Sequence, residues 1–286
     1  MTKIIKAVLP VAGMGTRFLP ASKAVPKELF PILDKPLIEY AVREAIEAGA
    51  EDFIFVISPE KMAILKHFED NPVLVASLLE KGKEEIIDSV KNIIPGSITT
   101  VIQKKALGLG HAINLAKDLV GNNPFHVLLP DDLVLSNTPC QKQLAEAYLK
   151  TGSGVVAVED VPLSEVHKYG VLDSDDTSPN LVKVKGFVEK PKAEVAPSTL
   201  SIIGRYILPP SIFDALGKGI VGAGGEIQIT DAMTDILNME NFYGLRFEGT
   251  RFDCGSKLGF LEAQIAFSKQ DPDLKDHVED ILKKYI

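Results

Sequence analysis

The segment from residue 8 to residue 36 combines glycines, cations and prolines in a way that suits phosphate chemistry. Its sequence is VLPVAGMGTRFLPASKAVPKELFPILDKP, in which Gly13 and Gly15 follow a short apolar run. Glycines let backbone N–H groups approach phosphate oxygens, because no Cβ stands in the way. Arg17, Lys23 and Lys27 add three positive charges within eleven residues. We therefore expect an ordered loop that binds a ligand with several phosphate charges.

Two familiar nucleotide-binding motifs do not fit this segment. A dinucleotide fingerprint needs a third glycine three residues after Gly15, where the chain has Phe18. A P-loop needs Gly-Lys-Ser or Gly-Lys-Thr after four spacer residues, and this loop has neither sequence. The cluster instead favours a nucleoside triphosphate together with a second phosphate, and it argues against an NAD-dependent oxidoreductase.

Paired carboxylates follow another apolar run. Asp131 and Asp132 come directly after the stretch 125–129 and Pro130. Carboxylates at the end of a strand suit Mg²⁺, which prefers oxygen ligands and leaves positions for substrate phosphates. The same pair is also compatible with a turn or a helix N-cap, particularly for Asp132.

A glutamine occupies the corresponding position after a different apolar run. Gln103 follows residues 98–102, and Gly108 opens the next expected helix. A glutamine amide offers one donor group and one acceptor, so Gln103 could read the polar edge of a base such as uracil. A solvated polar residue is the plainer alternative. We assign no acid or base chemistry to His111, since a histidine at a helix start commonly makes local hydrogen bonds.

The elements that must hold these residues alternate between strand and helix over the first half of the chain. Expected strands cover residues 4–11, 53–57, 98–102 and 125–129, and expected helices begin near Pro36, Pro59 and Gly108, with further helix within 70–95. Strands that are apolar on both faces are typical of a parallel sheet covered by helices. The alternation predicts an α/β fold, a Rossmann-like doubly wound, mostly parallel (mixed) sheet. Ligands bind such sheets at the carboxyl ends of the strands.

The second half of the chain is less regular. Expected strands cover 155–158, 170–172, 181–188 and 200–207, and expected helices cover 228–239, 256–268 and 273–284. This pattern predicts an α+β extension of the same sheet. We interpret 1–286 as a single domain, with a nucleotide-binding half (1–150), a substrate-binding half (151–255) and C-terminal helices (256–286).

Composition excludes several classes of function. The chain has 286 residues, 31 basic and 39 acidic, for a net charge of −8. A net-acidic chain is a poor electrostatic partner for nucleic acid or an anionic membrane. Two cysteines make neither a disulfide framework nor a zinc site, and no stretch approaches a membrane span. We expect a cytoplasmic enzyme.

Several motifs together resemble those of the sugar-phosphate nucleotidyltransferase family, in its bacterial uridylyltransferase branch. They stand in the family's order along essentially the whole chain: GMGTRFLPASK with PKEL, then QKKALGLGHA, LLPDDLV, KYGVL, VEKP, IGRYIL, GGEIQITDA and FDCGS. Several motifs in the right order are more specific than any one of them.

The resemblance implies an activity, substrates and a metal. The reaction would be UTP + α-D-glucose 1-phosphate ⇌ UDP-glucose + pyrophosphate, in carbohydrate metabolism and polysaccharide biosynthesis. Mg²⁺ would bind Asp131 and Asp253 and assist in-line attack of the sugar phosphate on the α-phosphorus. The family also tends toward homodimers and homotetramers.

Residue roles follow from the same resemblance. Arg17, Lys27 and Lys190 would be catalytic, holding the phosphate groups. The nucleotide would contact Ala12, Gly13, Gly15, Thr16, Glu28, Gln103 and Gly108. The sugar phosphate would contact Gly170, Glu189, Lys190 and Glu226, although Glu226 is equally compatible with a helix-capping role.

Two alternatives remain open at this point. One is a thymidylyltransferase or another NDP-sugar pyrophosphorylase, because these residues do not by themselves exclude a 5-methyl group on the base. The other is a non-catalytic nucleotide-sugar sensor, since a fold does not fix an activity.

Overall fold

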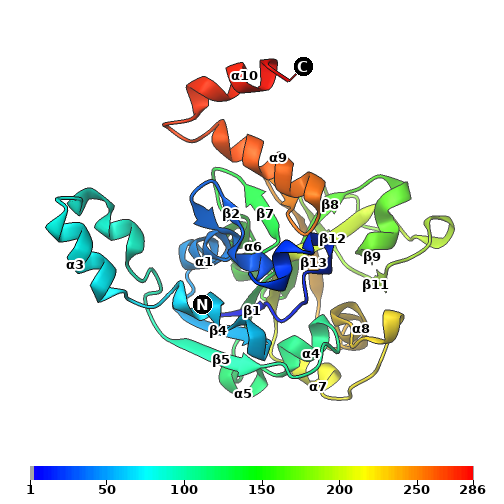
Figure 1. Cartoon of the computed structure of the whole chain (residues 1–286). Coiled ribbons are helices and arrows are strands. Elements are labelled where there is room, and N and C mark those ends of the chain that lie inside the picture. Colours follow the sequence, from blue (N-terminus) through cyan, green and yellow to red (C-terminus); the bar gives the residue numbers. More distant parts are fainter. Residues whose placement is uncertain (1–2, 286) are drawn as a thin grey trace.

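A large twisted sheet runs through the centre of the molecule. The computed structural model describes residues 3–285. The sheet order is β10 (Leu181–Lys183), β13 (Phe242–Arg246), β8 (Gly154–Asp160), β12 (Leu200–Leu208), β6 (Phe125–Leu128), β1 (Lys6–Pro10), β4 (Asp52–Ile57) and β5 (Ile98–Ile102). Two further strands, β9 (Gly170–Asp173) and β11 (Gly186–Glu189), pair with each other, and β9 also contacts β12 (Figure 1).

Strand directions divide the sheet as the sequence predicts. In the first half β6, β1, β4 and β5 are all parallel, in the order that a doubly wound fold requires. In the second half β12 runs antiparallel to both β6 and β8. The prediction of a mostly parallel, mixed sheet is therefore confirmed.

Helices cover both faces of the sheet. One face packs α1 (Leu37–Glu47) and α2 (Ala63–Lys66) on the first strands, and α6 (Cys140–Thr151) on β8 and β12. The opposite face packs α4 (Leu109–Asn114), α5 (Lys117–Val120), α7 (Ile212–Leu216) and α8 (Ile229–Asp235). Along β1, Ala7 and Leu9 enter the first core while Val8 enters the second. This alternation explains why the strand is apolar on both sides.

Two small antiparallel sheets lie beside the main one. They are β2 (Pro31–Ile32) with β3 (Lys35–Pro36), and β7 (Asp132–Leu135) with β14 (Thr250–Asp253). The helix α9 (Lys257–Ser268) packs against both through a shared apolar cluster that includes Ile32, Leu133 and Phe252. Phe30 and Phe260 extend this contact edge to face. Through these contacts, α9 holds the β7–β14 pair against the β2–β3 pair, which follows the glycine-rich loop in the sequence.

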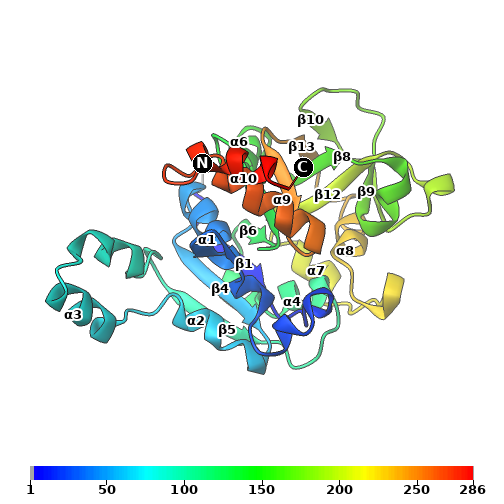
Figure 2. The same cartoon turned by 45° about the horizontal axis from the view of Figure 1, so that its top comes forward.

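Two segments project from this body. The helix α3 (Pro72–Glu80) sits on an excursion between β4 and β5, and α10 (Lys275–Lys283) follows α9 at the C-terminal end (Figures 1 and 2). Among residues 3–285, every helix is too short or too polar to cross a lipid bilayer.

The structure corrects the sequence prediction in two places. The expected strand 181–188 is two strands, because Val184 and Lys185 turn the chain from β10, which pairs with β13, to β11, which pairs with β9. The helix expected to begin near Pro59 is a 3₁₀ turn over Pro59–Lys61 followed by the single turn of α2. The β7–β14 pair, the strand β13 and the helices α6 and α7 had no counterpart in the prediction.

A buried histidine gives the fold a pH dependence. His126 on β6 is 0% exposed; its Nε2–H donates to the Ile4 carbonyl (3.1 Å), and its Nδ1 accepts from Gln141 Nε2 (2.9 Å). Both ring nitrogens are thus satisfied in the neutral form. Complete burial lowers the pKa of His126 to about 4, although the Ile4 carbonyl favours protonation.

We therefore expect His126 to make the fold less stable in mild acid. The unfolded chain would bind this proton near pH 6.5 and the folded chain near pH 4, so the stabilisation is complete above about pH 6.5 and is lost as pH falls toward 4. The free energy of unfolding should fall by up to about 1.4 kcal/mol per pH unit in that window. Urea titrations at pH 7, 6 and 5 measure it. A His126→Gln variant should show a shallower slope than the wild type, and parallel slopes would contradict the assignment.

Candidate active site

A cleft and a smaller pocket lie at the carboxyl edge of the parallel strands. The cleft has a volume of about 670 Å³, and eight of its lining residues are ones that the sequence singles out: Arg17, Asp131, Asp132, Gly170, Glu189, Lys190, Glu226 and Asp253. The pocket, of about 230 Å³, is lined by Ala12, Gly13, Gln103 and Gly108 among others. Leu109 and Glu226 line both spaces. The two therefore adjoin each other, and together they can hold a base and a chain of phosphates.

The glycine-rich loop closes back on itself beside the cleft. Gly15 has φ +62°, a left-handed conformation that favours glycine, and a Cβ there would lie 3.4 Å from the Lys27 side chain. Ser22 Oγ donates to the Gly15 carbonyl (2.8 Å). Arg17 Nη1 donates to the Gly255 carbonyl (3.3 Å), so the loop reaches across to the residues that follow β14. These contacts hold the loop in place at Gly15 and at Arg17, as expected for an ordered loop.

Lys27 and Asp131 form an ion pair at the edge of the cleft. Burial lowers the pKa of Lys27, but the adjacent Asp131 charge outweighs this and holds the pKa above its ordinary value. Burial likewise opposes ionisation of Asp131, yet Lys27 keeps the Asp131 pKa below its usual range. Both groups are therefore charged near neutral pH, and each is the other's counterion until a ligand arrives.

Glu28 lies away from the cleft, although the resemblance made it a nucleotide-binding residue. It is 2% exposed, and its two oxygens accept hydrogen bonds from Lys61 Nζ at 2.7 and 2.8 Å. Burial raises the pKa of Glu28 and lowers that of Lys61 despite their contact. The pair ties the turn that carries Lys27 to the segment after β4. We expect Glu28 to position Lys27 through the chain rather than to contact a ligand.

Asp131 and Asp253 face one small space beside Gly255. A Cβ on Gly255 would lie 2.9 Å from Asp131 Oδ2, 2.9 Å from Asp253 Oδ1 and 3.3 Å from Arg17 Nη1. Only glycine leaves that space open. Burial raises the pKa of Asp253, and the nearby charges of Asp132 and Asp131 act in the same direction. A buried space between two carboxylates that repel each other is a fitting place for a cation.

The described part of the chain holds no ready-made group of three or more His, Cys, Asp or Glu ligands. Mg²⁺ commonly binds one or two carboxylates and completes its octahedron with water and substrate phosphates. Asp131 and Asp253 therefore fit the predicted metal site.

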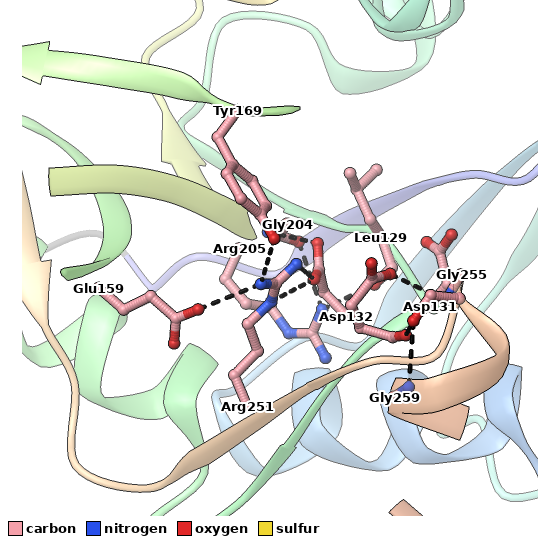
Figure 3. Close-up of polar contacts among 12 residues, drawn as sticks. Leu129, Asp131, Asp132, Glu159, Tyr169, Gly204, Arg205, Arg251, Gly255 and Gly259 are labelled. Carbon is pink, nitrogen blue, oxygen red and sulfur yellow. Dashed lines mark hydrogen bonds and ion pairs between the residues drawn. The ribbon is translucent and has the colours of Figure 1, made fainter. Parts of the chain in front are cut away.

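Asp132 has a different partner from Asp131. Its Oδ1 accepts from Arg251 Nε (2.6 Å) and its Oδ2 accepts from the Gly204 backbone N–H (2.9 Å). Arg251 Nη1 also donates to Glu159 Oε1 (3.1 Å) and to Tyr169 Oη (3.2 Å), and its guanidinium lies 5.1 Å from the centre of the Tyr169 ring (Figure 3). Arg251 thus links β7 and β14, the strands that carry Asp132 and Asp253, to Tyr169, the residue that precedes Gly170.

A second arginine, Arg205, fixes the turn before Asp131. Arg205 on β12 is 0% exposed and pairs with Glu44 of α1 through Nη2 (2.8 Å). Its Nη1 donates to the Leu129 carbonyl (2.8 Å), and the Leu129 N–H donates to the Gly204 carbonyl (2.8 Å) (Figure 3). The turn that presents Asp131 is therefore fixed by hydrogen bonds to a fully buried arginine and to its neighbour Gly204.

Neither arginine was a candidate in the sequence analysis. The sequence did contain a signal for Arg251. In TRFD (residues 250–253), Arg251 and Asp253 lie two residues apart with the apolar Phe252 between them, which is the alternation of a β-strand. That spacing places Arg251 and Asp253 on the same face of β14.

Loss of Arg251 is expected to lower kcat at least tenfold, since Asp132 would keep its charge beside Asp131 and Asp253 with no counterion. Arg251→Met tests this, with Arg251→Lys retaining part of the activity. Arg246→Met is a matched control, because Arg246 is a half-exposed arginine on β13 that pairs with Asp160. Steady-state rates on samples with matched unfolding curves give the comparison. Equal activity of the two Met variants would contradict the role of Arg251.

The other end of the cleft carries the residues predicted to bind the sugar phosphate. Glu189 ends β11 and accepts from Thr230 Oγ1 (2.8 Å), and Lys190 Nζ lies 3.2 Å from Glu189 Oε1. Lys190 has φ +46° and its backbone N–H donates to the Tyr169 carbonyl. A Cβ on Gly170 would lie 2.5 Å from Thr230 Cγ2. The glycine therefore lets β9 pack directly against α8 at the mouth of the cleft.

The small pocket contains the predicted base-reading residue. Gln103 is 7% exposed, and its Nε2 lies 2.8 Å from His111 Nδ1 and 3.4 Å from the Gly108 carbonyl. Gly108 has φ +103°, and a Cβ there would lie 2.8 Å from both Glu226 Cβ and the Ile227 carbonyl. The glycine thus lets the segment before α4 approach residues 226–227, and Glu226 borders both the pocket and the cleft.

Several loop residues that the sequence singles out line neither space: Gly15, Thr16, Lys23, Lys27 and Glu28. Of these, Thr16 and Lys23 are exposed. Lys23 therefore differs from Arg17, which lines the cleft, and from Lys27, which is largely buried and pairs with Asp131, although the sequence groups the three cations together.

Comparisons with known proteins agree with this geometry. The family model described as nucleotidyl transferase matches residues 6–270. A UTP–glucose-1-phosphate uridylyltransferase of Staphylococcus epidermidis is 47% identical over 285 residues, 99% of each chain. Among solved structures, a UTP-bound UGPase from Acinetobacter baumannii has a TM-score of 0.88 at 39% identity and 98% coverage of both chains. A UDP-glucose pyrophosphorylase complexed with UDP-glucose has a TM-score of 0.83 at 42% identity, covering 94% of this chain and 100% of that one. The chain therefore belongs to the nucleotidyl transferase family, alongside its UTP–glucose-1-phosphate uridylyltransferases.

Proposed function

We propose that this protein transfers the uridylyl group of UTP to α-D-glucose 1-phosphate, giving UDP-glucose and pyrophosphate. The observation that carries the proposal is the pair of adjoining spaces: a pocket that Gln103 lines lies beside a cleft lined by the cations Arg17 and Lys190 and the carboxylates Asp131 and Asp253. The relatives' names and their UTP and UDP-glucose complexes support the same substrates. A thymidylyltransferase structure from Bacillus anthracis shares the fold at only 22% identity.

The nucleotide would lie along the N-terminal half of the site. Gln103 and the backbone near Gly108 would contact uracil in the small pocket. The backbone from Ala12 to Thr16 would approach the triphosphate, since even a Cβ placed on Gly13 would meet no other atom within 4 Å, and the space beside it is open. Arg17 would hold the β- and γ-phosphates and stabilise the departing pyrophosphate, while Lys27 would lie near the α-phosphate.

The sugar phosphate would enter from the other end. Lys190 would hold its phosphate, Glu189 would accept hydrogen bonds from sugar hydroxyls, and the Gly170 backbone would border the ring. The attacking phosphate oxygen is already ionised near neutral pH, because the second phosphate pKa is about 6. No general base is needed, which suits a cleft that none of the described histidines lines. These side chains would act by aligning two anions and screening their repulsion.

Asp131 and Asp253 would hold Mg²⁺ in the space that Gly255 leaves open. When bound there, the cation would neutralise phosphate charge and orient the oxygens of the two substrates. Lys27 would then exchange its pairing with Asp131 for the α-phosphate, because the metal would replace it as the counterion of that carboxylate.

Removal of divalent cations is expected to stop turnover. With EDTA in excess, pyrophosphate release should fall below about a hundredth of the starting rate, since the phosphate charges would lose several kcal/mol of stabilisation. Added Mg²⁺ should restore it. Unchanged turnover in EDTA, after dialysis against the chelator, would remove the metal from the proposal.

A substrate matrix tests the proposed function. Initial rates of pyrophosphate release are measured with UTP, dTTP, CTP and GTP, each against glucose 1-phosphate and other sugar 1-phosphates. We expect the highest kcat/KM for UTP with glucose 1-phosphate. A preference for dTTP would favour the thymidylyltransferase alternative, and no turnover with any pair, despite nucleotide binding, would favour a sensor. Assembly as a homodimer or homotetramer is a further proposal, which light scattering on the eluting protein would test.

A further inference from the structure

The Gln103 side chain can be oriented from its surroundings alone. The Gly108 carbonyl oxygen, 3.4 Å away, can only accept a hydrogen bond, so the end of the amide that faces it is the NH₂ group. The same nitrogen lies 2.8 Å from His111 Nδ1. An amide NH₂ cannot accept, and therefore Nδ1 accepts and the His111 ring carries its proton on Nε2. Burial lowers the pKa of His111, which agrees with a neutral ring.

This orientation leaves the amide oxygen for a ligand. Within residues 3–285, Gln103 Oε1 makes no hydrogen bond to protein. Nor is it one of the fully enclosed side-chain oxygens without a partner, which in that part of the chain are Asn114 Oδ1 and Gln141 Oε1. It is therefore accessible, and the space that Gln103 lines is the small pocket beside Ala12 and Gly13.

We propose that His111 is a positioning residue that makes the site select uracil over cytosine, by holding the Gln103 amide with its oxygen toward the base. The inference rests on the proposed function and deepens it. Uracil carries a hydrogen on N3 and can donate to Gln103 Oε1, whereas cytosine N3 carries a lone pair and would face that oxygen with no hydrogen between them. A freely rotating amide could turn its NH₂ group to cytosine instead. A locked amide cannot, so a cytosine base leaves a buried acceptor unpaired.

His111 therefore acts through Gln103 and touches no reacting atom. Its replacement should change which base is accepted more than how fast the bound substrates react. A residue that served only to hold α4 would alter UTP and CTP to the same degree.

The test is the ratio of kcat/KM for UTP to kcat/KM for CTP, measured on the full chain with glucose 1-phosphate. His111→Leu removes the acceptor, and we expect the ratio to fall about tenfold, mostly through a higher KM for UTP. His111→Asn keeps an acceptor oxygen near the position of Nδ1 and should hold the ratio within about threefold of the wild type. His111→Ala replaces the Leu variant if that one does not fold.

A double-mutant cycle with Gln103→Leu separates the two residues' effects. In the Gln103→Leu background, His111→Leu should change the ratio less than about twofold, because no amide remains to be oriented. An unchanged ratio in His111→Leu, or equal effects of His111→Leu with and without Gln103, would overturn the inference while leaving the proposed function intact. A wild type that turns over neither UTP nor CTP would instead overturn the proposed function, and this inference with it.

Discussion

Asp131→Asn is expected to lower kcat by about a hundredfold or more while the chain remains folded. The substitution keeps the size of the side chain and removes the charge from one of the two carboxylates that face the space at Gly255. It would weaken binding of the divalent cation and leave Lys27 without its counterion. Steady-state turnover at saturating UTP, glucose 1-phosphate and Mg²⁺ measures the effect, with a thermal unfolding curve for each sample.

An aspartate on the surface, away from the site, provides the control for this substitution. Asp118 on α5 is exposed and lies outside both the cleft and the small pocket. Asp118→Asn removes the same charge at the surface and should leave kcat within about twofold, because exposed charges interact weakly through water. A folded Asp131→Asn protein with the turnover of Asp118→Asn would show that the Asp131 charge has no part in the reaction.

Lys27→Ala is the second large effect that we expect, again a loss in kcat of about a hundredfold. The side chain is largely buried at the edge of the cleft, and its only partner among the described residues is Asp131. Its removal takes away a positive charge near the α-phosphate and leaves a buried carboxylate unpaired, so some stability should also be lost. Mg²⁺ in the assay would compensate the second effect but not the first.

Lys23→Ala is the matched control on the same loop, since Lys23 is exposed and lines neither space. We expect it to retain nearly full activity. The double variant Lys27→Ala/Asp131→Asn should be less impaired than the product of the single effects, because the two groups act on one cluster of charge. Fully multiplicative losses would contradict a shared role, and equal activity of the two lysine variants would exclude Lys27 from the mechanism.

The sequence predicted the part of the fold in which local pattern and tertiary packing agree. The strand 98–102 matches β5 at both ends, and the run 4–11 contains β1 (Lys6–Pro10), because both are short runs rich in β-branched or apolar residues. Gly108 is the residue before α4, as the pattern of Ala112 and its neighbours indicates. These elements fix the carboxyl edge of the sheet, which is why most of the predicted residues meet there.

The pairing of β7 with β14 was not predictable in the same way. The two strands are more than a hundred residues apart and each has four residues, so neither has a strong local signal. Yet their register places Asp253 opposite Asp132 and Arg251 opposite Val134. That pairing decides which carboxylate faces Arg251 and which faces the space at Gly255. The sequence could therefore nominate Asp131 and Asp253, but it could not assign Asp132 to Arg251.

Glu28 is a residue that the sequence nominated for the site but that the structure buries in an ion pair. Its position in PKEL made it a plausible ligand residue, yet its partner Lys61 lies 33 residues away in a different turn, with no motif to connect them. Both side chains are buried because the segment after β4 packs on the loop, and the sequence alone does not indicate this contact. The same holds for Lys23, whose charge in the sequence is indistinguishable from that of Lys27.

A crystal structure of the protein with UDP-glucose and Mg²⁺ tests the central claim most directly. We predict uracil in the small pocket against Gln103, and the diphosphate in the cleft between Lys27 and Lys190. The metal should bind carboxylate oxygens of Asp131 and Asp253 at about 2.1 Å, and the glucose ring should lie against Glu189 and Gly170. A diphosphate bound elsewhere, or a metal that contacts neither carboxylate, would contradict the account.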